Sequence, residues 1–471
     1  MRTQKTIAII GGGVSGALTA YHLVRNEANA RIVLIDPRPE LGLGLAYSTP
    51  SYRHLLNVPA GKISALPDQP DHFLRWLNAN YDANLTAADF APRAVFGRYI
   101  QSLIEETPGL EHLQSFVRNL RVDRGRAVLD LADGATLVAD AVVIATGNFD
   151  PAPFPGVAEE AIASGAYCHS AWEDATYANL PADAPVALIG SGLTTVDVIL
   201  RLREIGHRGP ITAISRHGVF PHRHAAYQPL DAPVIAGEAP ISARELLRQV
   251  HRAIKAGHEW RAVIDSLRSR TNELWLALPI AEQKRFRRHL QRRWDVARHR
   301  MAPPIADIIE AELDAGSLTL RRGSLHAIEP IARGAQVQYK TAEGAMDAAE
   351  AARVINCTGP NMNYRRAGSP LLDSLFAQGL VVPGPLGGGL WTDQSGALRK
   401  RDGEFSSILF SVGPGRQGTL LESIAVPELR EQAVELAAML TRQFEDAGEP
   451  EVGAAFEDQA AEVMAGYDLA S

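Results

Sequence analysis

Apolar positions form their clearest pattern near the start of the chain. An unbroken apolar run at residues 7–10 leads into the sequence GGGVSG at residues 11–16, and apolar residues then recur at the spacing of one helix face. A second apolar run, residues 32–35, ends at Asp36. This pattern predicts a buried parallel strand, a glycine turn, a helix and a second buried strand.

The glycines of this turn have the spacing of a dinucleotide-binding βαβ unit. Gly11 would allow the tight turn, Gly13 would let the backbone approach a pyrophosphate, and Gly16 would let helix and strand pack closely. The phosphates would lie against backbone N–H groups at the positive end of the helix dipole, with Ser15 beside them. Asp36 would accept hydrogen bonds from a ribose. We therefore predict a first dinucleotide site here.

The same pattern returns in the second part of the chain. An apolar run at residues 186–189 leads into Gly190 and Gly192, with Thr195 where a third glycine would stand. The next strand ends on Arg216 instead of an acid. Because a guanidinium favours a 2′-phosphate, this second site suits NADPH better than NADH. The alternative is that Arg216 is only a solvated residue at a strand end.

Both halves continue through a short β region and end in a buried strand followed by Thr-Gly. Clustered prolines mark a linker between them, and a late strand, a turn at Gly413 and a helix would return the chain to the first domain. We expect an α/β fold with two Rossmann-like (βαβ) dinucleotide-binding domains, the second inserted in the first. The expected parts are 1–150 and 351–445 for the first domain, 151–350 for the second with a helical insertion at about 241–315, and a C-terminal tail at 446–471.

The helical insertion is expected to contain long helices with two apolar stripes. The first stripe is formed by Leu247, Val250 and Ile254, and the second by Phe286, Leu290, Trp294 and Ala297. Residues 284–300, around the second stripe, are the most basic part of the chain. We interpret these charges as a solvated helix face, and the alternative is the anion-attracting rim of a cleft.

Composition excludes several classes of function. With 47 Lys and Arg against 54 Asp and Glu, the net charge of −7 gives no indication of a nucleic-acid partner. The two cysteines, Cys168 and Cys357, form no CxxC pair, so a dithiol redox centre is not expected, and no metal-ligand spacing occurs. The short apolar start and the lack of an apolar run of about 18 residues predict a cytoplasmic protein without a membrane partner.

The segment from His54 to Lys62, between the two glycine motifs, mixes polar with apolar residues and could form the wall of a pocket. His54, Asn57 and Lys62 are isolated polar residues among apolar ones, which is typical of pocket linings but also of satisfied core residues. The preceding loop, residues 37–47, has glycines, including Gly44, that suit a backbone folded against a ligand. A plain surface loop is the alternative.

Two dinucleotide sites, without a dithiol or a metal site, indicate electron transfer between two bound cofactors as the simplest chemistry. A nicotinamide at the second site would pass a hydride to a flavin at the first, and the cofactors would carry the difficult steps. The glycine motifs do not indicate what the reduced flavin then does.

Much of the chain resembles a bacterial FAD/NAD(P)-binding protein family related to flavin-containing and N-hydroxylating monooxygenases. The resemblance is carried by the motifs GGGVSG, GLGLAYST, HLLNVPAGKIS, DHFLRWL, PRAVFGRYI, GSGLTTVD and VPELREQA, within residues 5–47, 54–77, 90–100, 186–216 and 407–432. It implies FAD contacts at Gly11, Gly13, Gly16, Asp36 and the Gly413 turn, and NAD(P)H contacts at Gly190, Gly192, Thr195 and Arg216. Where related flavoproteins usually carry Gly-Asp in the last turn, this chain has Gly413-Pro414.

One branch of this family is similar to FAD-dependent urate hydroxylases of purine metabolism. The resemblance thus implies a single-component monooxygenase that uses NADPH or NADH and O₂ to hydroxylate a small, urate-like substrate. His54 to Lys62 would cover the flavin ring, and Lys62 and Arg93 would be the first cations to test against an anionic substrate. The alternatives are an NAD(P)H-dependent reductase serving a quinone or protein partner, and a non-catalytic flavin-bound redox sensor. The oligomeric state stays open.

Overall fold

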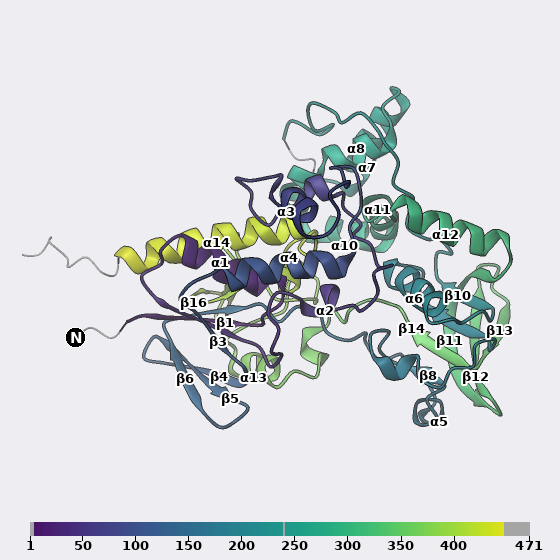
Figure 1. The fold of residues 1–471 in the computed structure, drawn as a ribbon, viewed down its shortest axis with the longest axis horizontal. Helices are drawn as coiled ribbons and strands as arrows, with labels where there is room; N and C mark the ends of the chain where they lie inside the picture. Colours follow the sequence, from purple (N-terminus) through teal and green to yellow (C-terminus); the bar gives the residue numbers. More distant parts are fainter. Residues whose placement is uncertain (1–3, 239–240, 447–471) are drawn as a thin grey trace, which may run out of the picture.

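The computed structural model describes residues 4–238 and 241–446. Of the expected C-terminal tail, 446–471, all residues after 446 lie outside this range. Two sheets of mostly parallel strands lie side by side, with a group of helices above the region where they meet (Figure 1). The first sheet has six strands in the order β15-β16-β7-β1-β2-β3, the second has seven in the order β13-β12-β11-β10-β9-β14-β8, and β4-β5-β6 form a small third sheet. The expected mixed α/β class is confirmed.

The first sheet is built from strands at both ends of the chain. Its members are β1 (Thr6–Ile10), β2 (Arg31–Ile35), β3 (Leu110–Leu113), β7 (Ala141–Ile144), β15 (Ala397–Arg399) and β16 (Phe405–Ser411). β16 pairs in parallel with β7, which in turn pairs with β1. Every residue of β1 is buried, because helices or the small sheet cover both faces, and this explains its unbroken apolar run.

Alternate side chains of these strands enter two different cores. Ile7 and Ile9 pack with the helices α1 and α14, whereas Ala8 and Ile10 pack with α13 and the small sheet. In Figure 1, α1 and α14 lie together on one side of the strands and β4 to β6 on the other. The elements of these layers are α1 (Val14–Arg25), α2 (Gly44–Tyr47), α3 (His72–Asn80), α4 (Arg93–Glu105), α13 (Pro370–Gln378), α14 (Val426–Asp446), β4 (Val117–Asp123), β5 (Arg126–Leu131) and β6 (Thr136–Ala139).

The second sheet repeats the arrangement of the first. Its elements are β8 (Tyr167–Cys168), β9 (Val186–Ile189), β10 (Ile211–Ser215), β11 (Leu318–Ile331), β12 (Gly334–Thr341), β13 (Met346–Ala351) and β14 (Arg353–Asn356), with α5 (Glu159–Ala163), α6 (Leu193–Glu204) and α12 (Pro303–Asp314). β14 pairs with β9 and β8. The second sheet therefore extends beyond residue 350, where we expected the second domain to end.

The short β region of the second half begins with two strands, β11 and β12. β11 first pairs in parallel with β10 and then in antiparallel fashion with β12. A bulge between Leu325 and Ala327 lets one extended strand serve both partners, which is a common use of an extra residue. The third strand, β13, begins only at Met346.

The helical insertion consists of shorter helices than we expected. They are α7 (Ala243–Lys255), α8 (Trp260–Ser266), α9 (Thr271–Ala277), α10 (Ile280–His289) and α11 (Gln291–Arg298). The second apolar stripe crosses the break at Leu290, where the backbone leaves regular helix geometry with φ −117°. In the first stripe Ile254 is 37% exposed, so α7 buries its apolar face only in part.

The solvated-face interpretation of the basic segment is correct for some residues and wrong for others. Lys284, Arg285 and Arg293 are exposed. Arg298 and Arg300 are only 6% and 1% exposed, respectively, because they form ion pairs with carboxylates of other segments. Sequence reasoning placed no partner beside them.

The described part of the chain also contains five short 3-10 helices: η1 (Ala60–Lys62), η2 (Asp174–Thr176), η3 (Arg268–Arg270), η4 (Tyr364–Arg366) and η5 (Gly413–Gly418). Of these, η5 follows β16 directly and places Gly413 at the carboxyl end of the first sheet. No helix within the described ranges is long and apolar enough to cross a bilayer.

Candidate functional site

The first glycine turn has the geometry that its spacing predicts. Gly11 has φ +109°, a conformation that favours glycine, and a Cβ atom there would overlap the carbonyl oxygen of Ala145. A Cβ atom on Gly16 would overlap the carbonyl oxygen of Gly11. The close packing of β1, α1 and the end of β7 therefore depends on these two glycines.

Two distant segments converge on the N-terminus of α1. A Cβ atom on Gly413 would collide with the Ser15 hydroxyl, and one on Gly13 would lie 3.3 Å from Cα of Gly44. Gly413 and Gly44 both have positive φ, +76° and +55°. The loop around Gly44 is thus folded against the glycine turn, as the ligand-contact interpretation requires, and the backbone of both segments borders the predicted pyrophosphate position.

Asp36, the predicted ribose contact, is a buried carboxylate that directly follows β2 and contacts the first glycine turn. It is 4% exposed and accepts hydrogen bonds from the Gly12 N–H at 2.7 Å and from the Arg38 N–H and Nε at 2.9 and 3.0 Å. Burial alone would raise the pKa of Asp36, but the bonds from Arg38 and Gly12 hold it below the ordinary value. Arg38 was not among our candidates, although a basic residue two positions after the acid could have indicated it.

The second glycine turn is more open than the first. Gly190 has φ +124°, and a Cβ atom there would lie 2.5 Å from the carbonyl oxygen of Cys357. At Gly192, by contrast, no atom lies within 4 Å of a Cβ position, so there is space in front of the helix N-terminus. Thr195 is fully buried in α6 at the third position of the motif. These residues fit a pyrophosphate approaching Gly192.

Basic side chains surround this second turn. Arg216 and His217 are exposed at the end of β10, and burial together with Arg216, Arg292 and Arg322 lowers the pKa of His217. Arg292 reaches over from α11 and donates to the carbonyl oxygens of Ser191 and Val219 at 2.9 and 2.6 Å. Sequence reasoning found only Arg216, because Arg292 and Arg322 come from segments far away in the chain. The cluster creates a positive potential where a 2′-phosphate would lie.

His54 and Arg93 join the two halves of the molecule. The Arg93 guanidinium donates to both carboxylate oxygens of Asp197 in α6, at 2.7 and 3.2 Å. His54 Nε2 donates to the Asp197 carbonyl oxygen at 2.9 Å, so Nδ1 accepts from the Thr49 hydroxyl at 2.7 Å. Burial lowers the pKa of His54. The carboxylate of Asp197 thus pairs with the charge of Arg93 and links α4 to α6.

The other two candidate site residues lie apart from this bridge. The backbone carbonyl of Asn57 accepts from His224 Nε2 at 3.0 Å, and its side chain is half-buried. Lys62 is exposed, with Nζ 5.8 Å from the ring centre of Tyr227, and it borders a cavity. Of our four catalytic candidates, only Lys62 contributes to that cavity.

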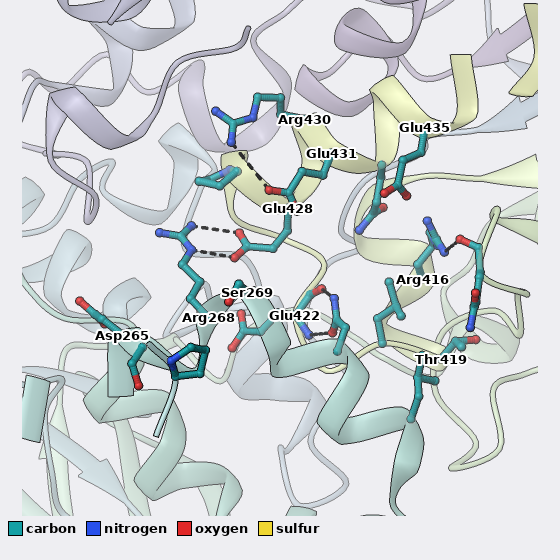
Figure 2. A pocket seen from close by; sticks show the side chains of 18 of the residues that line it. Asp265, Arg268, Ser269, Arg416, Thr419, Glu422, Glu428, Arg430, Glu431 and Glu435 are labelled. Atoms are coloured by element: carbon teal, nitrogen blue, oxygen red, sulfur yellow. Dashed lines mark hydrogen bonds and ion pairs between the residues drawn. The ribbon is translucent and has the colours of Figure 1, made fainter. Parts of the chain in front are cut away.

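This cavity has a volume of about 870 Å³ and lies between the helical insertion, η5 and the first turns of α14. Figure 2 shows Arg268 paired with Glu428 on one side of it and Arg416 on another side. Arg268 donates to both oxygens of Glu428 at 3.0 and 3.2 Å. The cavity is large enough for a small substrate and lies beside the Gly413 turn. Among the described residues, no group of His, Cys, Asp and Glu is placed to hold a metal ion.

Glu422 is a buried carboxylate of the cavity wall whose charge should stabilise the fold. Burial would raise its pKa, but His299, Arg298 and Trp294 lower the pKa from 4.5 to about 2. Because the folded-state pKa is depressed, the stabilisation is complete above about pH 4.5 and is lost as the pH falls toward 2. We expect the difference in unfolding free energy between the wild type and Glu422→Gln to shrink by about 2 kcal/mol between pH 6 and pH 3.

Urea unfolding at a series of pH values measures this difference. Glu404→Gln removes an exposed carboxylate and serves as the matched control. If the difference in unfolding free energy between the wild type and Glu422→Gln stayed constant across this pH range, the lowered pKa of Glu422 would be contradicted.

Comparison with known proteins places the first glycine turn in a known domain type. Residues 8–149 match the family described as FAD-NAD(P)-binding (NAD_binding_9). The uncharacterized protein YdhS of Escherichia coli K12 is 25% identical over 253 residues, which are 50% of this chain and 45% of YdhS. The match thus spans less than half the length of that relative.

Solved structures share the fold over most of the chain. The ornithine N-hydroxylase of Kutzneria sp. 744 superposes with a TM-score of 0.62 at 16% identity, covering 94% of this chain and 99% of that one. The ornithine hydroxylase of Pseudomonas aeruginosa gives 0.59 at 15%, and the flavin-containing monooxygenase of Stenotrophomonas maltophilia gives 0.54 at 20%, each covering 93% and 99%. The expected cofactors, FAD and a nicotinamide dinucleotide, are confirmed at the level of the family model: residues 8–149 match the FAD-NAD(P)-binding family. The chain shares its fold with these flavin monooxygenases and N-hydroxylases.

Proposed function

We propose that this chain is a flavin-dependent monooxygenase that uses NADPH and O₂ to hydroxylate a small molecule. The observation that carries this proposal is the pair of glycine turns, one on each sheet, in two halves that the ion pair of Arg93 with Asp197 joins. A separate cavity of about 870 Å³ lies beside the Gly413 turn. The first sheet would hold FAD and the second NADPH. The flavin, when bound, supplies the transfer of electrons from the nicotinamide to oxygen.

The residues of this chain would bind and position the two cofactors. Gly11, Gly13, Ser15 and Gly16 with Gly44 and Gly413 would enclose the FAD pyrophosphate, and Asp36 would hold the ribose, displacing or joining Arg38. Gly190, Gly192 and Thr195 would form the equivalent turn for NADPH, with Arg216 near the 2′-phosphate. The domains would comprise 1–150 with the return segment to 445, and 151 to about 356 with the helical insertion.

Relatives of the fold support oxygen insertion without specifying a substrate. The Kutzneria structure is described as containing reduced FAD, NADP⁺ and L-ornithine, and other neighbours are named as flavin monooxygenases. The proposal of a urate-like purine as the substrate is based on the sequence resemblance alone. It belongs in a substrate panel with amines and aromatic acids.

A reductase remains the second candidate, because thioredoxin reductase of Lactococcus lactis also superposes, with a TM-score of 0.54. A dithiol mechanism has no support in this chain, since Cys357 is buried and Cys168 is partly buried and both are free. Burial raises the pKa of Cys357 to about 12, so its thiol stays protonated at neutral pH. A reductase would have to deliver electrons to a diffusing acceptor.

NADPH oxidation with simultaneous peroxide detection tests the proposal. For the correct substrate, we expect faster NADPH consumption with less than one equivalent of H₂O₂. Stoichiometric H₂O₂ with every compound, or electron delivery to a quinone, would replace the monooxygenase with the reductase. A flavin that NADPH does not bleach would favour the redox sensor.

Arg216→Ala tests the choice between the two nicotinamide cofactors. The loss of charge-assisted hydrogen bonds to a 2′-phosphate should lower the ratio of kcat/KM for NADPH to that for NADH by about tenfold to a hundredfold. Steady-state kinetics with both cofactors measures this ratio. Arg333→Ala, which changes an exposed arginine between β11 and β12, is the control. An unchanged ratio in Arg216→Ala would make Arg216 a solvated strand-end residue.

A further inference from the structure

The cavity wall contains a buried arginine without a carboxylate partner. Arg298, Arg300 and Arg416 are 6%, 1% and 3% exposed, and they are the buried arginines among the described residues. Arg298 pairs with Glu428 and Arg300 with Asp265. Arg416 has no carboxylate within ion-pair distance in the described part of the chain, which sets it apart from the other two.

The guanidinium of Arg416 is only partly satisfied. Its Nη2 donates to the carbonyl oxygens of Asp393 and Gln394 at 3.1 and 2.8 Å, and its Nε has no acceptor. Burial lowers the pKa of Arg416 to about 10, so the group remains charged at neutral pH. Glu435 and Asp393 act on this charge from a distance and oppose the lowering, but neither forms an ion pair with it. A buried guanidinium without a directly bonded carboxylate is unfavourable, and a bound anionic group would stabilise it.

A second unsatisfied donor lies on the same wall. The Thr392 side chain is 1% exposed, and its hydroxyl has no hydrogen-bond partner. Its backbone N–H donates to the Thr419 hydroxyl at 2.9 Å, which joins this segment to the end of η5. Thr392, Thr419 and Arg416 all line the 870 Å³ cavity. The wall therefore presents two donors in need of an acceptor.

The position of Arg416 relates this wall to the predicted FAD site. Arg416 follows Gly413 by three residues in η5, and Gly413 contacts Ser15 at the start of α1. In Figure 2 Arg416 lies beside the cavity, across from the ion pair of Arg268 and Glu428. A ligand in this cavity would be close to whatever binds at the Gly413 turn.

We propose that Arg416, together with Thr392, receives an anionic, oxygen-bearing group of a ligand in this cavity. Two sources have this chemistry. One is the pyrimidine edge of FAD, which becomes more negative when the flavin is reduced, and this source rests on the proposed function. The other is the carboxylate of an organic acid substrate. In either case Arg416 would be an anion contact in addition to the two cations expected from the sequence, Lys62 and Arg93.

The first experiment addresses the flavin as the source. The reduction potential of bound FAD is measured in the wild type, Arg416→Gln, Arg416→Lys and Thr392→Val. If Arg416 stabilises the reduced flavin, Arg416→Gln should weaken the preference for reduced over oxidised FAD by about tenfold, which corresponds to a potential about 30 mV lower. Arg416→Lys keeps the charge and should recover part of this loss.

The second experiment addresses an organic acid as the source. Binding of benzoate to the FAD-loaded protein is followed by the flavin absorbance. If Arg416 binds the carboxylate, Arg416→Gln should weaken benzoate binding by at least about tenfold while the potential stays unchanged. Thr392→Val, which is nearly isosteric, should weaken it by a smaller factor and guards against a folding defect in the Arg416 variants.

Arg430→Gln is the matched control, because Arg430 lines the same cavity but already lies 3.8 Å from Glu431 and donates to the Ser64 carbonyl at 3.0 Å. An unchanged potential together with unchanged benzoate affinity in Arg416→Gln and Thr392→Val would overturn the proposal, as would equal effects in Arg430→Gln. Neither measurement needs turnover. Failure of the monooxygenase assignment is therefore distinguishable from failure of the anion site.

Discussion

Gly16→Ala is expected to weaken FAD binding by about tenfold to a hundredfold. A methyl group at this position would overlap the carbonyl oxygen of Gly11, which is a backbone atom and cannot rotate away as a side chain could. Relief requires α1 to move away from β1, and overpacking of this kind costs about 1–3 kcal/mol. The N–H groups at the start of α1 would then no longer meet the pyrophosphate in the required geometry.

Gly192→Ala is the matched control, because it makes the same chemical change in the second glycine turn. No atom lies within 4 Å of the Cβ position there, so the fold should tolerate the methyl group and FAD should remain bound. The methyl would instead occupy the space predicted for the NADPH pyrophosphate, and KM for NADPH should rise. The FAD content and the NADPH kinetics of both variants measure the two expected effects. Full retention of FAD in Gly16→Ala would contradict the prediction that this glycine is required for FAD binding.

The two βαβ units could be predicted from the sequence because their signals are local. An apolar run, glycines at fixed spacing and a helical period together specify the path of β1 through α1. The same holds for β9 and α6, and the structure gives Gly11 and Gly190 the positive φ that such turns require. The return of β16 to the first sheet was also predictable, from its late strand-turn-helix pattern.

Burial of charged residues in the helical insertion could not be predicted in this way. Whether an arginine is solvated or buried depends on its partners, and Arg298 pairs with a glutamate 130 residues away, Glu428. Arg300, which follows α11, pairs with Asp265 in α8. Arg416 is the opposite case, since its lack of a partner becomes visible only in the folded chain. These ionic contacts carry no periodic signal in the sequence.

Among the site residues, too, those within one local motif could be predicted from the sequence, whereas contacts between distant segments could not. The glycines and Asp36 come together as their motif predicts, because one short segment positions them. His54 and Arg93 were selected as isolated polar residues, and such residues can serve either a pocket or a structural contact. Both contact Asp197 from the second half of the chain, and no local sequence pattern connects Arg93 with Asp197.

Arg93→Ala is expected to lower the free energy of unfolding by about 3–5 kcal/mol, since it leaves a buried carboxylate without its partner. The side chain of Asp197 is only 6% exposed, and that of Arg93 is 17% exposed. Because the pair joins α4 of the first half to α6 of the second, the variant should also slow hydride transfer from NADPH while FAD stays bound. Urea unfolding and stopped-flow reduction of the flavin measure the two effects.

The double variant Arg93→Met with Asp197→Asn separates this bridge from a substrate role. Removing both charges avoids the unpaired carboxylate, so the double variant should regain most of the stability that Arg93→Ala loses. Arg98→Ala, an exposed arginine on the same helix, is the control and should change the unfolding free energy by less than about 0.5 kcal/mol. If Arg93→Ala instead kept full stability and lost only affinity for an anionic substrate, Arg93 would be a ligand contact and the bridge would be incidental.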